Sequence, residues 1–437
     1  MNRKHLLFVF VLGAAFGMAS FSSSAAAVDV AVVGGGTSGI AAALAASATG
    51  AKTVILERSD SLGGTMTRAS VSWPGLFHAW GRQIIAGPAW ELVKAACLKS
   101  KQKLPDFTCD PGQQHWKHQV RFTDKVYEAL AREELSRAGV EVRFGCEVSK
   151  AERTADGWRL GWSGGSVEAR EVVDCTGNAT VAALCGAERA KGKVCQPGTY
   201  AYAITPGCDI RKIDEAAIGV AWKKAIAAGT VLSTDCISGS PYYDLDGRSY
   251  NHIPGADNST AELQAETNRR GRESMERMLA FFHAQPGLEK ARVVWSSKET
   301  GVRETYRVVG RATVTEDDYV SGRVFPDAVC YSFYPIDIHT EEGVTPKALK
   351  KGCVPTVPFG SLLPKGVDNV LVAGRAISSD RGANSALRVQ ATCMAAGQAA
   401  GVAAALAAKR GIAPGSLPIE DIRTALRAIG AIVPQAQ

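Results

Sequence analysis

The stretch that decides the fold is Val28-Asp29-Val30-Ala31-Val32-Val33-Gly34-Gly35-Gly36-Thr37-Ser38-Gly39. Its β-branched first half predicts a strand, and the three glycines that follow predict a tight turn. Residues 38–49 are rich in Ala and predict a helix that ends at Gly50. Residues 52–56 predict a second strand, with Glu57 directly after it. Together these elements form one βαβ unit of about 30 residues.

The glycines in this unit have separate physical roles. Gly34 permits the turn out of the strand, Gly36 leaves no side chain between the backbone and a pyrophosphate, and Gly39 lets the helix approach the sheet closely. The phosphates would lie at the helix N-terminus, where free N–H groups face them. Glu57 follows Gly39 by 18 residues and can accept hydrogen bonds from ribose hydroxyls. The unit therefore predicts a dinucleotide site, which FAD and NAD fit equally at this stage.

Composition excludes several other classes of protein. Apolar residues make up 46% of the 437 residues and charged residues 21%, which is typical of a folded globular chain and not of a disordered one. The net charge of +7 is mild and no Lys/Arg block is dense, so we expect no nucleic-acid partner. The 11 cysteines contain no C-x-x-C pair and the 7 histidines are scattered, so no metal site is predicted. Two local disulfides, Cys97–Cys109 and Cys195–Cys208, are possible.

Residues 1–27 predict a signal peptide. Arg3 and Lys4 form a positive start, residues 6–18 are apolar, and residues 22–27 are small, as a cleavage site requires. The apolar run is shorter than the ~20 residues of a spanning helix. We therefore expect an exported protein, periplasmic or secreted, whose leader is removed.

Three segments resemble the FAD enzymes of the glutathione-reductase type. Residues 57–67 are similar to the segment in which an acid is followed by a Gly-Gly pair close to the flavin diphosphate. Residues 173–179 are similar to the strand-turn element beside the adenine half, although many relatives have Asp where this chain has Asn178, and residues 369–375 resemble the second flavin-binding motif. With the glycine unit, the resemblance implies that FAD contacts Gly34, Gly36, Thr37, Ser38, Gly39, Glu57, Arg58, Gly63, Gly64, Thr65, Val148, Thr176, Gly177, Gly374, Arg375, Ser385 and Val389.

A closer resemblance is to the FAD-dependent oxidoreductase family, whose members are often secreted. It is carried by residues 301–310, 335–339, 357–364 and 385–392. The resemblance implies an α/β protein with a Rossmann-like FAD domain of the glutathione-reductase type and an inserted substrate domain. We expect the FAD domain at residues 28–190 and 360–437, and the substrate or cap domain at residues 191–359. Residues 384–409 predict one long Ala-rich helix; it could span a membrane, but its small residues favour close packing in a soluble core.

Five residues are candidates for catalysis. Arg303 and Arg307 would share a face if helical; they could bind a carboxylate or stabilise negative charge, or form a solvated pair. Asp337 and His339 would face one side of a strand, so the carboxylate could orient the imidazole as a base, or the two could form a structural pair. His78 follows the Gly-Gly segment and could reach the flavin or serve packing.

The sequence also lacks parts that NADPH-fed relatives have. It contains no second glycine fingerprint after residue 80 and no redox cysteine pair. We therefore expect hydride transfer between a small polar substrate and FAD, with an external electron acceptor or donor. Two alternatives remain open: a reductase of an activated double bond fed by an electron-transfer partner, and a non-catalytic FAD-binding protein.

Overall fold

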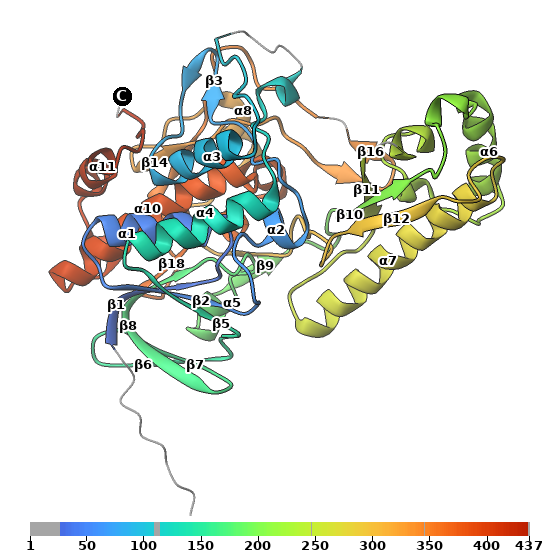
Figure 1. The fold of residues 1–437 in the computed structure, drawn as a ribbon. Helices are drawn as coiled ribbons and strands as arrows, with labels where there is room; N and C mark the ends of the chain where they lie inside the picture. Colours follow the sequence, from blue (N-terminus) through green and yellow to red (C-terminus); the bar gives the residue numbers. More distant parts are fainter. Residues whose placement is uncertain (1–26, 109–113, 246, 345, 436–437) are drawn as a thin grey trace, which may run out of the picture.

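The computed structural model describes residues 27–108, 114–245, 247–344 and 346–435 (Figure 1). The predicted leader lies outside these ranges, except for Ala27, and so does Cys109. Cys195 and Cys208 are both free thiols, so the possible disulfide between them is not present.

A seven-stranded mixed sheet supports the larger of two lobes. Its order is β5-β2-β1-β8-β7-β6, and β18 also pairs with β8. The pairs among β1, β2, β5, β8 and β18 are parallel, whereas β6-β7 and β7-β8 are antiparallel. The strands are β1 Ala27–Val33, β2 Thr53–Glu57, β5 Glu141–Phe144, β6 Lys150–Arg153, β7 Trp158–Trp162, β8 Gly165–Asp174 and β18 Val370–Val372. The expected α/β fold with a Rossmann-like domain is therefore present.

Strand β8 joins the two ends of the chain. Its first half pairs with β7, where Trp158 lies opposite Ala169, and its second half pairs with β18, where Val370 lies opposite Val172. The opposite edge of β8 pairs with β1 along most of its length. The chain thus returns near residue 370 to the sheet that it began at residue 27.

Helices cover this sheet, with α1 and α10 packed directly on each other (Figure 1). An added Cβ at Gly397 would lie 2.3 Å from the Ser38 carbonyl oxygen, and one at Gly401 would lie 2.0 Å from that of Ala42. The small residues therefore allow a helix contact that no larger side chain would permit. The helices of this lobe are α1 Thr37–Ala48, α2 Thr65–Arg68, α3 Pro88–Lys99, α4 Asp124–Arg137, α5 Thr180–Leu184, α9 Arg381–Leu387, α10 Gln390–Arg410 and α11 Ile419–Ala428.

Two expectations about local structure are wrong. The single helix expected over residues 384–409 is divided into α9 and α10, because Val389 adopts an extended backbone with ψ 138°. The polar, irregular sequence of residues 238–251 predicts a long loop, but this segment contains most of a strand, β11 Arg248–Ile253. This strand is polar because its side chains bond within the lobe: Asn251 donates to Ser274 Oγ at 2.6 Å and accepts from Tyr202 Oη at 3.0 Å.

Helix α10 is the one described helix long and apolar enough to cross a membrane, with a mean hydropathy of 1.4 over its most apolar 18 residues. However, 94% of that window is buried inside the protein. A helix buried on all sides is typical of a protein core.

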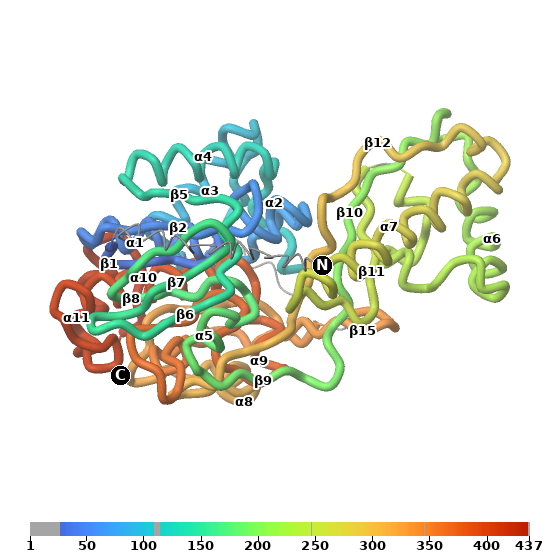
Figure 2. Tube along the Cα trace, turned by 90° about the horizontal axis from the view of Figure 1, so that it is seen from below, coloured from blue at the N-terminus to red at the C-terminus, as the bar shows by residue number. Residues whose placement is uncertain are grey.

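The smaller lobe is built on the three-stranded sheet β11-β10-β12, at the right of Figures 1 and 2. It contains β10 Gly198–Thr205, β12 Arg292–Ser296, α6 Glu215–Ala227 and α7 Ala261–His283. Its own buried cluster includes Tyr202, Trp222, Met278 and Phe282. The lobe therefore has a core separate from that of the large sheet.

Residues 314–338 and 349–359 contribute to the core of the larger lobe instead. Val314, Tyr319, Val329 and Phe359 belong to the same buried cluster as α1 and α10. The predicted division at residues 191–359 stays a prediction. The elements outside both sheets are β3 His78–Ala79, β4 Arg82–Gln83, β9 Arg189–Lys191, β13 Tyr306–Val308, α8 Glu316–Ser321, β14 Ala328–Tyr331, β15 His339–Thr340, β16 Gly343–Val344 and β17 Thr356–Pro358.

Glu171 is a buried acid in the middle of the sheet. Its side chain is 1% exposed, Oε1 accepts from Asn369 Nδ2 at 2.7 Å, and Oε2 has no partner among the described residues. Burial raises the pKa of Glu171 to about 8, although the Asn369 hydrogen bond and the Arg153 charge act in the opposite direction. Glu171 is therefore protonated in the folded protein at neutral pH.

We predict that this acid makes the protein less stable as pH rises. The unfolded chain loses the proton near its ordinary pKa of 4.5, whereas the folded chain keeps it to about pH 8. The free energy of unfolding should fall across this window, by about 1.4 kcal/mol for each pH unit that Glu171 resists ionisation. Urea titrations between pH 5 and 8 would measure this slope. Glu171→Gln should flatten it and Glu168→Gln, on the outer part of β8, should not; equal slopes in wild type and Glu171→Gln would contradict the assignment.

Candidate active site

A cavity of ≈ 860 Å³ lies where the two lobes meet. Its floor is formed at the carboxyl ends of β1, β2 and β8, by Val33, Leu56 and Cys175 among others. The smaller lobe contributes residues from β10, β11 and the segment after β12. Ligands of open α/β sheets bind at this edge of the sheet.

Two glycine turns lie side by side in the cavity wall. Gly63 donates from its backbone N to the Gly35 carbonyl oxygen at 2.8 Å, and Gly36 forms a bridge with Gly63. A Cβ added at Gly36 would meet no protein atom within 4 Å, so this backbone faces open space. Gly34, with φ +101°, adopts a conformation that side chains disfavour. The turns leave a bare backbone surface at the N-terminus of α1.

Glu57 ends β2 at the edge of this surface. Its Oε2 accepts from Gly35 N at 2.6 Å, and its Oε1 accepts from Ser59 N at 2.8 Å. The carboxylate is buried but lines the cavity. Since each oxygen has a second lone pair, the fixed carboxylate can also accept from a hydroxyl of a bound ligand.

Arg375 brings a positive charge to the same wall. Its guanidinium donates to the carbonyl oxygens of Gly177 and Val302 and to the side-chain oxygens of Asn178 and Asn258, at 2.8 to 2.9 Å. All four acceptors are neutral, and no ion pair of Arg375 occurs among the described residues. Burial lowers the pKa of Arg375 to about 10. The Arg375 charge has no counterion among the described residues, and a cofactor phosphate could serve as one.

The predicted cofactor residues mostly line the cavity. Two of them do not: Gly39 packs α1 against the preceding turn, where an added Cβ would lie 1.9 Å from the Gly34 carbonyl oxygen, and Ser385 Oγ accepts from Asp337 N at 3.0 Å. The residues in the lining are Gly34, Gly36, Thr37, Ser38, Glu57, Arg58, Gly63, Gly64, Thr65, Val148, Thr176, Gly177, Gly374, Arg375 and Val389. Bare backbone, a helix N-terminus, a hydroxyl acceptor and a guanidinium without a counterion among the described residues together fit a dinucleotide.

Another part of the cavity wall holds a polar cluster. Asp337 Oδ2 lies 3.1 Å from His339 Nε2 and 3.5 Å from the guanidinium of Arg388. Arg303 donates to the Pro197 carbonyl oxygen. Burial acts to raise the pKa of Asp337, but His339, Arg388 and Arg303 outweigh it and hold that pKa below its ordinary value. Asp337 is therefore an anion beside two guanidinium groups.

His339 also contacts His252, which lies on β11 of the smaller lobe, so this pair of rings links the two lobes. The distance from His339 Nδ1 to His252 Nε2 is 3.0 Å. Burial, opposed by the Asp337 hydrogen bond, lowers the pKa of His339 to about 4, and burial with the Arg303 charge lowers that of His252 to about 3. Both rings are neutral at pH 7. Because ionised Asp337 only accepts, His339 carries its proton on Nε2 and accepts from His252 at Nδ1.

Two candidate catalytic residues lie outside the cavity lining. Arg307 is on β13 instead of a helix, and it donates to the Ser379 carbonyl oxygen at 2.9 Å and pairs with Glu304 at 3.7 Å. His78 stacks on Phe107, with ring centroids 3.7 Å apart. Both side chains make packing or structural contacts, and Arg303 and Arg307 do not share a helical face.

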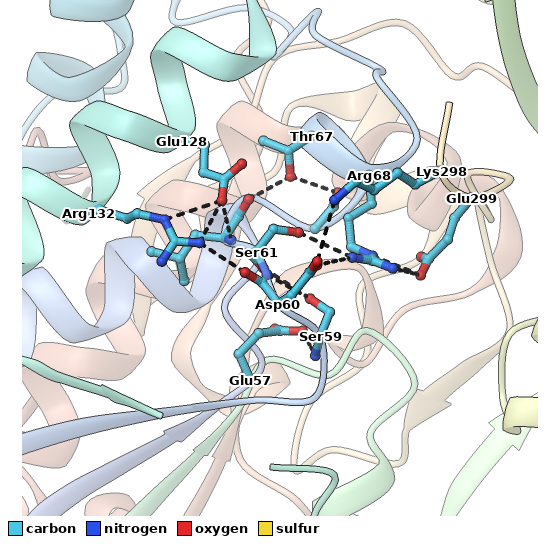
Figure 3. A network of polar contacts seen from close by, with 12 residues as sticks. Glu57, Ser59, Asp60, Ser61, Thr67, Arg68, Glu128, Arg132, Lys298 and Glu299 are labelled. Carbon is cyan, nitrogen blue, oxygen red and sulfur yellow. Dashed lines mark hydrogen bonds and ion pairs between the residues drawn. The ribbon is translucent and has the colours of Figure 1, made fainter. Parts of the chain in front are cut away.

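The rim between the lobes is held by Arg68 of α2 (Figure 3). It donates to Glu299 Oε1 from Nε at 2.7 Å and to Asp60 Oδ1 at 2.8 Å, while its carbonyl oxygen accepts from Glu299 N at 3.0 Å. Figure 3 shows Glu57 just beneath this network. The contacts between Arg68 and Glu299 fix the segment that leads from β12 to Arg303.

Sequence reasoning missed several residues of the site. Arg388 was not among the candidates, although it lies within residues 385–392, which resemble the family, and that resemblance is a usable signal. His252 gave no signal, because its partner His339 is 87 positions away. The aromatic lining residues Trp73, Trp116 and Tyr250 also gave none, since they come from separate segments.

Comparison with curated proteins gives no match. Among solved structures, a geranylgeranyl bacteriochlorophyll reductase-like protein from Thermoplasma acidophilum is 14% identical, with a TM-score of 0.42, over 92% of this chain and 83% of that one. The anhydrotetracycline hydroxylase OxyS from Streptomyces rimosus is 16% identical, with a TM-score of 0.45, over 92% and 65%. The p-nitrophenol 4-monooxygenase PnpA from Pseudomonas putida is 14% identical, with a TM-score of 0.42, over 91% and 84%.

One family model, described as FAD dependent oxidoreductase, matches residues 29–426. This range includes both glycine turns, Arg375 and the polar cluster of Arg303, Asp337, His339 and Arg388. The cofactor that the site fits is therefore FAD, and the chain belongs to the family of FAD-dependent oxidoreductase enzymes.

Proposed function

We propose that the protein is a dehydrogenase that removes a hydride and a proton from a small polar substrate and passes the electrons to an external carrier. The observation that carries this proposal is that one cavity contains both the glycine turns with Glu57 and the cluster of Arg303, Asp337, His339 and Arg388. FAD supplies, when bound, the two-electron acceptor. The antiparallel strands β6 and β7 beside β8, together with Gly63-Gly64, support a domain of the glutathione-reductase type.

The chain's own part is to hold the substrate and take its proton. Arg303 and Arg388 would orient a polar group and stabilise negative charge as it develops. Asp337 Oδ1 accepts no hydrogen bond from the described residues, so this oxygen is free for a substrate proton. The hydrogen bonds from His252 to His339 and from His339 to Asp337 both donate toward this carboxylate, so the two rings hold Asp337 in position as the base.

The same groups would serve the reverse reaction, the reduction of an activated double bond. Direction is tested with reduced protein under anaerobic conditions. Faster reoxidation by a quinone analogue than by an alkene acid supports a dehydrogenase, and the opposite order supports a reductase.

We predict that Gly36→Val removes the cofactor without unfolding the chain. The Val side chain would project into the open space in which the diphosphate is proposed to lie, and it would contact no protein atom within 4 Å at its Cβ. Absorbance near 450 nm after purification should fall at least about tenfold, while the far-ultraviolet spectrum stays unchanged. Gly161→Val on β7, whose Cβ would lie 3.6 Å from that of Lys150, is the matched control and should keep its FAD. If the Gly36→Val protein keeps its full yellow colour, the glycine turn does not form part of the FAD-binding site.

We predict that Arg303→Ala and His339→Ala keep FAD but slow its reduction by the substrate. Loss of a charge-stabilising group, or of the ring that positions the proton acceptor Asp337, should cost about 10²–10³-fold in rate. Anaerobic stopped-flow bleaching measures this rate. Arg311→Ala and His283→Ala remove the same side chains outside the cavity and should react as wild type does. Rates within about threefold of wild type would return Arg303 or His339 to a structural role.

We also propose that the enzyme acts outside the cytoplasm after its leader is removed, and that it exchanges electrons with a separate carrier there. Mass spectrometry of protein from the native host should find a mature start near residues 25–29, because Ala25, Ala26 and Ala27 suit signal-peptide cleavage. Intact Met1 in most molecules would contradict export.

A further inference from the structure

The polar cluster in the cavity wall contains more positive than negative charge. Arg303 and Arg388 are two guanidinium groups, and the one carboxylate of the cluster, Asp337, pairs with Arg388 at 3.5 Å. Glu304, the next acid along the chain, is engaged elsewhere, with Arg381 at 3.1 Å and Arg307 at 3.7 Å. His339, His252 and Tyr334 are neutral at pH 7, since the pKa values of the histidines are lowered and that of the tyrosine is raised. One positive charge is left without a partner.

The hydrogen bonds of these arginines also show that they have more donor groups than acceptors available to them. Arg303 donates to a neutral carbonyl oxygen, that of Pro197. Arg388 donates to the Asp337 carbonyl oxygen at 3.0 Å, but its contacts with Asp337 Oδ2 and Gln196 Oε1 are long, at 3.5 and 3.4 Å. Nε of Arg388 and Nε2 of Gln196 are buried without an acceptor among the described residues. Buried donors of this kind require an acceptor from a ligand or solvent.

Next to this cluster the cavity wall is aromatic. Trp73 of the larger lobe and Tyr250 of β11 lie with ring centroids 5.5 Å apart, at 48°. Tyr250 precedes His252 by two residues on the same strand, so both side chains point to one face, about 7 Å apart along it. Trp73 is 50% exposed and Trp116 is 54% exposed, which is unusual for residues that normally bury their rings.

We infer that the substrate is a monocarboxylate with a flat apolar body, whose carboxylate binds Arg303 and Arg388 while its body lies against Trp73 and Tyr250. This inference rests on the proposed function and names the substrate class. A guanidinium pair suits a carboxylate because its donors match the two oxygens. Asp337 favours one negative charge over two, because a dianion would place its second charge beside that carboxylate.

The test uses FAD-loaded protein and three probes: cinnamate, its neutral analogue cinnamamide, and acetate. Calorimetry and the change in the cofactor's visible spectrum measure binding. Cinnamate should bind at least about tenfold more tightly than cinnamamide, which lacks the charge, and than acetate, which lacks the body. Equal affinities for cinnamate and cinnamamide would overturn the anion site.

Variants separate the two halves of the inference. Arg388→Gln should weaken cinnamate at least about tenfold and leave cinnamamide unchanged, whereas Trp73→Ala should weaken both probes equally. Arg311→Gln is the matched control and should bind cinnamate as wild type does. If Arg388→Gln loses FAD while its fold is kept, the cation serves the cofactor and the inference fails. If the protein binds cinnamate but no tested substrate reduces its FAD, the carboxylate site stands and the proposed dehydrogenase function is refuted instead.

Discussion

The contact between α1 and α10 is the constraint on which the site depends. Ser38 lies against Gly397, and Ala42 lies against Gly401. Because the second contact is four residues further along both helices, α1 and α10 run parallel. Their N-termini therefore point the same way, toward the cavity. Because α10 begins seven residues before Gly397, it extends about 10 Å beyond the level of Ser38, at about 1.5 Å per residue. Val389, Gln390 and Cys393 reach the cavity wall for this reason. A side chain larger than hydrogen at Gly397 or Gly401 would separate the helices and move both helix starts apart.

The second lobe completes the site from the other side through a small number of polar contacts. Arg68 binds Glu299 at one rim, and His339 binds His252 at another. Neither contact belongs to a hydrophobic core, since each lobe has its own cluster of buried residues. A neutral histidine pair is sensitive to protonation, because an added proton would face Arg303 and Arg388 at close range. The low pKa values of both histidines keep this pair neutral at pH 7.

The sequence predicts the nucleotide half of the site far better than the polar cluster. Gly34, Gly36 and Glu57 lie on one βαβ unit, whose geometry follows from local patterns of strand, glycine and helix. The cluster of Arg303, Asp337, His339 and Arg388, with its neighbours Gln196 and His252, comes from distant segments that only the tertiary fold brings together. Asp337 and His339 were found because they are two residues apart, and His252 was not because the lobe interface supplies it. Arg307 was wrongly grouped with Arg303 on a helical spacing; β13 contains Arg307 but begins after Arg303, so no single element aligns the two side chains. The break at Val389 also escaped prediction, since nothing in the Ala-rich run requires it and the cavity wall decides it.

The arginines of the cavity explain how the cofactor and the proposed substrate can bind in separate parts of the same cavity. Arg375 is fixed by four neutral oxygens beside Gly177, where backbone N–H groups and the α1 terminus also favour a phosphate. Arg388 is fixed beside Asp337, and Arg303 is fixed by the Pro197 carbonyl oxygen. The Asp337 charge partly cancels theirs and makes that region less attractive to a doubly charged diphosphate. The cofactor's diphosphate is thus drawn to the glycine turns and a singly charged ligand to the polar cluster. Charge balance, more than shape, then sets the order of the two ligands along the cavity.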